Sequence, residues 1–370
     1  MTGDLAITAV KIWDASTTGG AEWANVPGQP SWEVVAFSAA DFTPDSRRLI
    51  VGGYDEPTSI VDVETGNRLA TIGPPPDDEY GVGWLDLSDD GRLLATGDYQ
   101  GPINVWDAST SAHRFAFPID SVQLRDVEWS HDGELLAVAF DKTAGGDPER
   151  WPGERGEVVI IDRSGAEVGR LHEEPGQRIL SVSFSPDGRL LATTHERMRS
   201  VDPTDMDLRI WDWERGNVVS SFEASAQFVV FNPTGTRIAT SRRVEGIADI
   251  WDAQTGDRVA TLAAASFIGD IAFSPDGTLV ATGHADGTVR LWDPDTGVQQ
   301  LVLRGADSRV SNVLFSPDGS KLVSVADDGI ARIRALDLDD LIAIATDRLT
   351  RTLTDNECRQ YLHVEPCPHP

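Results

Sequence analysis

Short apolar runs separated by polar turns fill most of the chain, and the most regular example lies between residues 270 and 303. Its first turn, Ser274-Pro275-Asp276-Gly277, combines a proline, which presets one φ angle, with a glycine, which accepts a positive φ. The third run alternates apolar and polar residues, which is typical of a strand with one buried face. The pattern predicts four antiparallel strands joined by tight turns, at residues 270–273, 279–282, 288–292 and 298–303.

The sequence repeats this unit, which a small sheet needs because it cannot bury both of its faces alone. The turn signature occurs seven times, beginning at Thr43, Ser88, Ser130, Ser185, Asn232, Ser274 and Ser316. A second motif, a bulky residue followed by Asp, ends the third strand at Trp13, Val61, Trp106, Ile161, Trp211, Trp251 and Trp292, with Ile333-Arg334-Ala335 as a degenerate last copy. Two motifs in register, spaced about 40 to 55 residues apart, indicate a repeat array.

These two motifs resemble those of the WD-repeat β-propeller family, and the resemblance covers residues 5 to about 336. It implies an all-β fold, a seven-bladed propeller of four-stranded antiparallel blades. We therefore expect a propeller domain over residues 1–336 and a separate extension over residues 337–370. The two longest departures from the repeat are insertions between the second and third strands of blades 3 and 4, at residues 141–156 and 195–207.

The resemblance also implies a hydrogen-bonded set of His, Ser or Thr, Asp and Trp within each blade. Thr282, Asp286 and Trp292 match three of these positions in blade 6, and Trp106, Trp211 and Trp251 match the Trp position elsewhere. The His that precedes the first strand is missing, and no blade has the complete set in sequence. We expect these residues to be structural and the blades to be held chiefly by apolar packing.

Ring closure is left open by the sequence. Propellers of this kind are commonly closed by an N-terminal strand that completes the last blade. Residues 9–14 align with a third strand, however, and so do residues 331–334, which makes eight third strands for seven first strands. The two segments compete for one place, so one is displaced or the chain is an excerpt of a longer array.

After Ile333 the hydrophobic period changes to that of helices. Leu338, Leu341, Ile342, Ala345 and Leu349 follow amphipathic helical spacing, and a capping box at residues 354–357 predicts a second, shorter helix. This short helical C-terminal tail is similar to extensions that follow the WD-repeat arrays of large bacterial signalling proteins, including STAND-type NTPases. The resemblance implies that an N-terminal effector domain of a longer chain is one partner of the propeller.

The chain is strongly acidic, which restricts its partners. There are 60 acidic and 31 basic side chains, giving a net charge of −29, so phosphate backbones and anionic membranes are not expected partners. The sequence has no apolar stretch long enough for a membrane span and no signal peptide at its start. We expect a cytoplasmic protein, in which Cys358 and Cys367, both in the tail, leave the propeller free of disulfides.

No catalytic motif stands out, and we expect neither enzyme activity nor a cofactor. The seven histidines are scattered, and a nucleophile elbow and a phosphate-binding glycine loop are both lacking. A cluster of His363, Glu365, Cys367 and His369 contains metal-ligand residue types, but zinc sites usually add a second ligand pair elsewhere, so we expect a plain tail and no metal.

The remaining candidate is a protein-binding surface. Loops between second and third strands, and loops that enter first strands, share one face of a propeller, here called the top face. Aromatic and Arg side chains dominate protein interfaces, so the expected partner-binding residues are Trp84, Arg125, Arg178, Phe267 and Arg309 near the axis and Trp151, Arg197 and Arg199 in the insertions. Alternatively, Trp84 belongs to the core and each Arg pairs with a neighbouring Asp.

Two functions fit these observations. The first is a non-catalytic scaffold or sensor that binds a peptide or protein segment on the top face. The second is a propeller enzyme, a metal-assisted hydrolase or lactonase, which would need several inward-pointing carboxylates at equivalent blade positions. The aligned first strands supply only Asp126 and Asp270 of this kind, which favours the scaffold.

Overall fold

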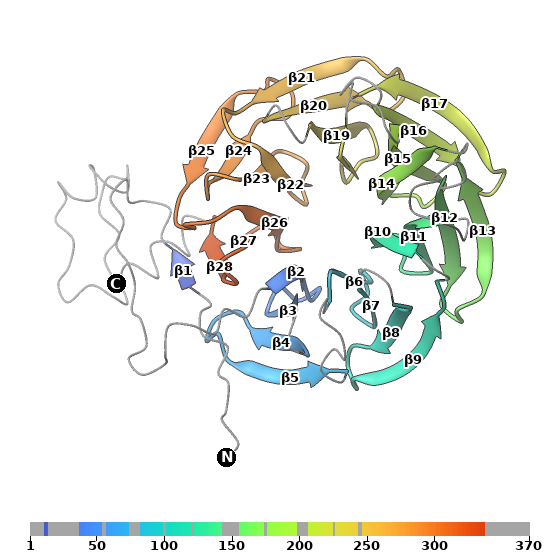
Figure 1. The fold of residues 1–370 in the computed structure, drawn as a ribbon. Coiled ribbons are helices and arrows are strands. Elements are labelled where there is room, and N and C mark those ends of the chain that lie inside the picture. The colour runs from blue at the N-terminus through green and yellow to red at the C-terminus, as the bar shows by residue number, and fades with distance from the viewer. Residues whose placement is uncertain are drawn as a thin grey trace, which may run out of the picture.

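Seven four-stranded sheets stand around a common axis in the computed structural model of the chain (Figure 1). The structure describes residues 11–13, 37–53, 57–73, 82–98, 101–119, 122–142, 155–173, 176–197, 206–224, 226–242 and 246–336. Both predicted tail helices and the histidine and cysteine residues after position 336 lie outside this part. The expected all-β, seven-bladed architecture is confirmed.

Each blade contains four strands, which are consecutive in the chain except in blade 7, with the first strand nearest the axis and the fourth on the outside (Figure 1). Blade 1 consists of β2 (Phe37–Phe42), β3 (Arg48–Gly53), β4 (Thr58–Asp62) and β5 (Arg68–Ile72). Blade 2 consists of β6 (Trp84–Leu87), β7 (Leu93–Gly97), β8 (Ile103–Asp107) and β9 (Ala112–Phe117). Blade 3 consists of β10 (Val122–Trp129), β11 (Leu135–Lys142), β12 (Arg155–Asp162) and β13 (Glu167–His172).

The remaining blades follow the same order. Blade 4 consists of β14 (Gln177–Phe184), β15 (Leu190–Arg197), β16 (Met206–Asp212) and β17 (Asn217–Glu223). Blade 5 consists of β18 (Phe228–Phe231), β19 (Arg237–Arg242), β20 (Ile247–Asp252) and β21 (Arg258–Ala263). Blade 6 consists of β22 (Ile268–Phe273), β23 (Val280–His284), β24 (Val289–Trp292) and β25 (Gln299–Leu303), and blade 7 of β26 (Val310–Phe315), β27 (Lys321–Ala326) and β28 (Ala331–Ala335) with β1.

The ring closes in blade 7 through β1 (Lys11–Trp13), which pairs with β28 on its outer side. The expected competition between residues 9–14 and 331–334 is wrong, because β28 takes the third place and β1 the fourth. The alignment misled because β1 carries the Trp-Asp ending of a third strand. Unlike the other fourth strands, β1 runs parallel to its neighbour, with Ile12 opposite Ile333.

The turn between first and second strands is built by side chains as well as by backbone. In blade 6 the Ser274 hydroxyl donates to Asp276 at 2.7 Å and accepts the backbone N–H of Leu279 at 2.9 Å. Gly277 has φ 71°, which a residue with a Cβ atom rarely adopts. The Ser-to-Asp bond recurs in blades 2, 3, 4 and 7, so the repeated signature is a self-contained local structure.

Apolar side chains fill the space between neighbouring blades. One buried cluster joins Leu93 and Val105 of blade 2 to Val127 and Phe140 of blade 3, and another joins blade 1 to blade 7. The alternation along each strand therefore serves two interfaces, because each blade buries one face against each neighbour. No blade is stable alone, and the closed ring gives every blade two partners.

The hairpins of blades 3 and 4 are longer than the sequence indicated. β11 and β12 remain paired out to Lys142 and Arg155, and β15 and β16 out to Glu196 and Met206. The predicted insertions, 141–156 and 195–207, therefore include residues at both ends that belong to the paired strands. Several residues assigned to loops, among them Asp141 and His195, are buried strand residues instead.

Candidate protein-binding face

Carboxylates of the innermost strands join each of several blades to the next. A first strand is an edge strand, so alternate backbone N–H groups lack a partner within its own sheet. Asp126 of blade 3 accepts the N–H of Val182 in blade 4 at 3.0 Å, and Asp270 of blade 6 accepts that of Val313 in blade 7 at 2.8 Å. These carboxylates supply the missing acceptors.

A second row of acceptors lies on the first strands of blades 1 to 4, at the position two residues nearer the turn than that of Asp126. Four side chains take part: Asp41 binds the N–H of Leu87, Asp86 that of Trp129, Glu128 that of Phe184 and Ser183 that of Phe231. Both rows point from one blade to the next along the chain. The period of two in a strand places both positions on the same side, which faces the next blade.

Burial raises the pKa of these carboxyl groups despite their hydrogen bonds. The pKa of Asp41 and that of Asp270 are each raised to about 7, and that of Asp126 to about 6. The pKa values of Asp86 and Glu128 are also raised well above their usual range, chiefly by burial, with a contribution from neighbouring carboxylates. The inner ring therefore retains protons near neutral pH.

At the aligned first-strand position only Asp126 and Asp270 are acidic, and the position two residues further along adds Asp41, Asp86 and Glu128. The alignment considered one inward position per strand, whereas the strand offers two. This is the feature that the enzyme alternative required. Each of these carboxylates, however, holds backbone of the next blade, and no group of three or more metal-ligand side chains is present among the described residues.

The predicted structural tryptophans bond to second-strand threonines of their own blades. Trp292 Nε1 donates to Thr282 at 2.8 Å, and Trp106, Trp211 and Trp251 make the same bond to Thr96, Thr193 and Thr240. Asp286 accepts the hydroxyl and the N–H of Thr288 in its own turn and pairs with Arg290 at 3.0 Å. These contacts lie within single blades and stabilise their geometry.

Blade 6 lacks the histidine before its first strand, but a histidine of its second strand takes part in the set. His284, two residues after Thr282 on β23, contacts the Thr282 hydroxyl at 2.7 Å and the carbonyl oxygen of Ser266 at 3.1 Å. The histidine thus reaches the same threonine from the second strand instead of from the segment before the first. The signal in the sequence was the Thr-Gly-His triplet at 282–284, which the motif comparison did not consider.

Blade 4 repeats this arrangement with an added ion pair. His195 contacts Thr193, and its Nδ1 lies 3.3 Å from Glu173 Oε1. Glu173, which precedes the first strand of blade 4, also pairs with Arg209. Burial lowers the pKa of His195 well below its usual value, so the ring is neutral. In blade 4, therefore, the side chain that reaches this set from before the first strand is the carboxylate of Glu173, where the family has a histidine.

The predicted top-face arginines have acidic neighbours. Arg125 Nε donates to Asp141 at 2.8 Å, and Arg178 of the next blade lies 3.5 Å from the same carboxylate. Arg309 lies 3.5 Å from Asp327. The alternative of local pairing therefore describes all three, and Asp141 joins blades 3 and 4 at the top face.

The other predicted binding residues have three different outcomes. Trp84 at the start of β6 is half-buried and packs against the core between blades 2 and 3, which agrees with the core alternative. Phe267, directly before β22, is 51% exposed. Trp151, Arg199 and the side chain of Arg197 lie outside the described residues.

Phe267 and Arg309 occupy the same place in neighbouring blades, seven residues before the turn signature. Arg178 and Gln123 hold this place in blades 4 and 3. All four lie where a first strand begins, next to the ends of the second strands. The top face thus presents an exposed aromatic ring and an exposed guanidinium group from adjacent blades, since the Arg309 side chain is 52% exposed.

Seven four-stranded sheets around one axis define a seven-bladed propeller, and four of its blades contain the Trp-to-Thr bond. The family model for the WD domain, G-beta repeat, matches residues 167–212, 256–293 and 297–334. These stretches fall in blades 3 and 4, blades 5 and 6, and blades 6 and 7.

The chain is also similar to several curated animal proteins, one of which is named for its WD repeats. It is 26% identical over 226 residues to mouse telomerase protein component 1, covering 60% of this chain and 8% of that protein. It is 26% identical over 214 residues to WD repeat-containing protein 1 of Bos taurus, covering 55% and 32%. The serine-threonine kinase receptor-associated protein of Gallus gallus is 24% identical over 269 residues, covering 71% and 68%. The chain therefore spans less than a third of the length of the first two.

Proposed function

We propose that this propeller is a non-catalytic interaction scaffold that binds a peptide or protein segment across its top face. The similarity to WD-repeat proteins supports the scaffold role, and one of these relatives is named for its association with a receptor. Because the matches cover only part of most relatives, the identity of the partner is not transferred to this chain.

The observation that carries the proposal is the pair Phe267 and Arg309. A phenyl ring that is half exposed costs free energy in water and returns it when a partner covers the ring. A guanidinium group at the equivalent place in the next blade can bind a carboxylate of the partner with two parallel hydrogen bonds. Asp327 is itself half exposed and lies 3.5 Å from Arg309, so a partner carboxylate competes with it for the guanidinium group.

The test places a photoactivatable phenylalanine analogue at residue 267 in cells that express the full protein. A matched control carries the analogue at Val298, which is 55% exposed but lies before the outer strand of blade 6. We expect one protein to crosslink from position 267 and not from position 298. The purified partner should then bind the double variant Phe267→Ala, Arg309→Ala at least about tenfold more weakly than wild type, as expected for interface hot spots.

Unchanged affinity of this variant, with an unchanged melting temperature, would place the site elsewhere. The insertions of blades 3 and 4 emerge on the same face, so their removal is the next step in that case. Attachment to a signalling NTPase remains a proposal that rests on the sequence of the tail.

The enzyme alternative keeps one supporting observation, the raised pKa values of the inner carboxyl groups, since perturbed groups cluster at functional sites. Metal analysis of the purified protein together with a panel of ester and lactone substrates tests it. Stoichiometric metal and turnover that is lost in Asp41→Asn would support catalysis. Their absence in a folded sample would support the scaffold.

A further inference from the structure

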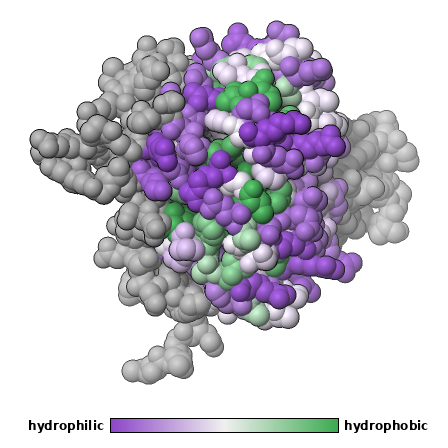
Figure 2. Space-filling model, turned by 90° about the vertical axis from the view of Figure 1, so that its right-hand side faces the viewer, coloured by the Kyte–Doolittle hydropathy of each residue, from purple (hydrophilic) through white to green (hydrophobic). Residues whose placement is uncertain are grey.

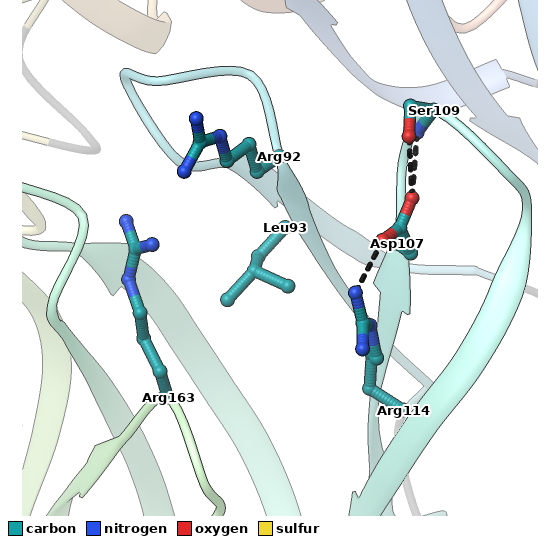
Figure 3. A pocket seen from close by; sticks show the side chains of 6 residues that line it. All are labelled: Arg92, Leu93, Asp107, Ser109, Arg114 and Arg163. Carbon is teal, nitrogen blue, oxygen red and sulfur yellow. Dashed lines mark hydrogen bonds and ion pairs between the residues drawn. The ribbon is translucent and has the colours of Figure 1, made fainter.

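A pocket lies on the face opposite the proposed binding face, at the boundary of blades 2 and 3. Six residues line its volume of about 490 Å³: Arg92, Leu93, Asp107, Ser109, Arg114 and Arg163 (Figure 3). They come from the first turn and the third-to-fourth-strand turn of blade 2, from β9, and from the corresponding turn of blade 3. Antiparallel strands place these turns at the end of each blade away from the top face.

Three of the six lining residues are arginines, in a chain whose acidic residues outnumber its basic ones by 60 to 31. The single lining carboxylate, Asp107, is already fully engaged. It accepts the Ser109 hydroxyl at 2.7 Å and the N–H of Thr110 at 3.0 Å, and it pairs with Arg114 at 2.5 Å. These bonds hold the pKa of Asp107 well below its usual range, so it stays ionised and bound to its own turn.

Arg163 is a departure from the repeat. The residue after the third-strand Asp is apolar in each of the other six blades: Val63, Ala108, Trp213, Ala253, Pro294 and, after Ala335 in blade 7, Leu336. Val63, Ala108 and Trp213 are buried there. Trp213 donates its indole N–H to the carbonyl of Gly188, and Arg163 Nε does the same to Gly133 at 2.6 Å. Arginine in this place keeps the structural bond and adds a charge.

The guanidinium group of Arg163 is held in position from both blades. Besides its bond to Gly133, Nη2 donates to Asp90 of blade 2 at 2.8 Å. Arg92 approaches the same Asp90 oxygen at 3.8 Å, and Figure 3 shows the head groups of Arg92 and Arg163 turned toward each other beside Leu93. Arg114 lies across the pocket. Arg163 Nε also lies 3.3 Å from Glu134. A guanidinium group carries five N–H donors, so the three arginines have more donors than these contacts use.

We propose that this pocket binds a phosphoryl group. Arginines that surround a pocket suit a tetrahedral anion, because phosphate offers three oxygens in three directions while a planar carboxylate offers two. A preorganised Arg163 reduces the entropy lost on binding. The shared chemistry is a dianionic phosphoryl group, either free or carried on a protein side chain. The site is distinct from the proposed top-face site and does not depend on it.

The test is calorimetric titration of the intact protein with inorganic phosphate and with the peptide acetyl-Gly-phosphoserine-Gly-amide, each up to about 10 mM, which covers weak affinities. The unphosphorylated peptide is the ligand control. We expect phosphate to bind and the affinity to fall at least about tenfold in Arg92→Gln and in Arg163→Gln.

Arg189→Gln is the matched protein control. Arg189 occupies the same turn position in blade 4 as Arg92 does in blade 2, its side chain is 84% exposed, and its ion pair with Asp187 is 4.0 Å long. Arg92 makes no side-chain hydrogen bond among the described residues, so Arg92→Gln should keep the wild-type melting temperature even if Arg163→Gln does not.

Tighter binding of the phosphopeptide than of phosphate would indicate that the ligand is a phosphoryl group on a protein side chain. Equal affinity for the two ligands would indicate free phosphate. No heat from either ligand, or equal loss of affinity in Arg92→Gln and Arg189→Gln, would overturn the proposal.

Discussion

The carboxylate of Asp126 accepts the backbone N–H of Val182 at 3.0 Å, so a side chain of blade 3 completes the hydrogen bonding of blade 4. The same carboxylate also accepts the N–H of its own neighbour, Val127, at 2.9 Å. Each Asp126 oxygen thus serves a different blade. Interfaces between propeller blades are usually described by their apolar packing, and here a polar bond contributes to the same interface.

Replacement of Asp126 tests this contribution. Asp126→Ala should lower the free energy of unfolding by about 1–3 kcal/mol, because it leaves the N–H groups of Val127 and Val182 without their acceptor. Asp126→Asn keeps one acceptor oxygen and should cost less than about 1 kcal/mol. Urea denaturation followed by tryptophan fluorescence measures both. Equal losses in the two variants would contradict a role for the hydrogen bond.

The pKa values of the inner ring predict a dependence of stability on pH. Asp41 and Asp270 retain protons up to about pH 7 in the folded state, while the unfolded chain releases them near the ordinary value of 3.8. The stability that these protonated groups contribute is fully present below the unfolded pKa of 3.8, and it is lost as pH rises toward and through 7. The melting temperature should therefore respond to these groups between pH 5 and pH 8.

The double variant Asp41→Asn, Asp270→Asn isolates the effect, since asparagine does not titrate. On going from pH 5 to pH 8, the melting temperature of wild type should fall by at least about 2 °C relative to that of the double variant. Calorimetric scans at both pH values measure this difference. Parallel curves for the two proteins would show that the inner carboxyl groups titrate normally.

The buried histidines predict the opposite trend. Burial lowers the pKa of His195 well below 6.5 and also lowers that of His284, so the unfolded state binds protons that the folded state does not. Their contribution is lost as pH falls below about 6.5. His195→Gln, which retains a polar group for Thr193, should show less destabilisation than wild type between pH 7 and pH 5.5, measured by urea denaturation. An identical pH response would contradict a neutral, buried His195.

Arg334 predicts a stabilising substitution. It replaces the tryptophan of the third strand in blade 7, is 1% exposed and donates to Ser324 at 2.6 Å, as Trp292 does to Thr282. Burial lowers its pKa to about 10, and among the described residues no carboxylate pairs with it. Arg334→Met should raise the free energy of unfolding by about 1 kcal/mol or more, because it removes a desolvated charge. A large loss of stability would show that the charge has a partner.

The sequence predicted the blades because their signals are local. Each turn signature and each Trp-Asp ending acts within its own strands, so residues such as Ser274 and Trp292 could be assigned without knowledge of distant contacts. The two competing third strands, by contrast, could only be placed by the ring as a whole. The pairing of Lys11–Trp13 with β28 depends on which edge is vacant, and no single segment encodes that information.

The position of the candidate residues at the starts of the first strands was predictable, and their role in binding stays a prediction. The start of the first strands was identified, and Phe267 and Arg309 are exposed there. Trp84 belongs to the core because neighbouring blades pack around it, and Arg125 and Arg178 converge on Asp141 because two blades meet there. Such relations join residues that are distant in sequence, and the repeat alone does not reveal them.

The outer strands β13 and β17 carry exposed apolar side chains. Figure 2 shows small apolar areas divided by hydrophilic ones on the side that carries the outer strands β13 and β17. Val168, Val218 and Val219 on these strands are exposed by 41–51%. Apolar patches of this size are normal for a monomer, so binding is better sought at the end faces.

The bonds between inner strands have one direction. Blade 1 supplies acceptors to blade 2, blade 2 to blade 3, blade 3 to blade 4 and blade 4 to blade 5, and blade 6 supplies one to blade 7. Each of these blades must therefore match its predecessor as donor and its successor as acceptor. A blade moved to another position, or duplicated, would bring a mismatched edge to both junctions. An exchanged pair of adjacent blades retains the junction between its two members, so exchange as a pair should cost less stability per blade than exchange of single blades.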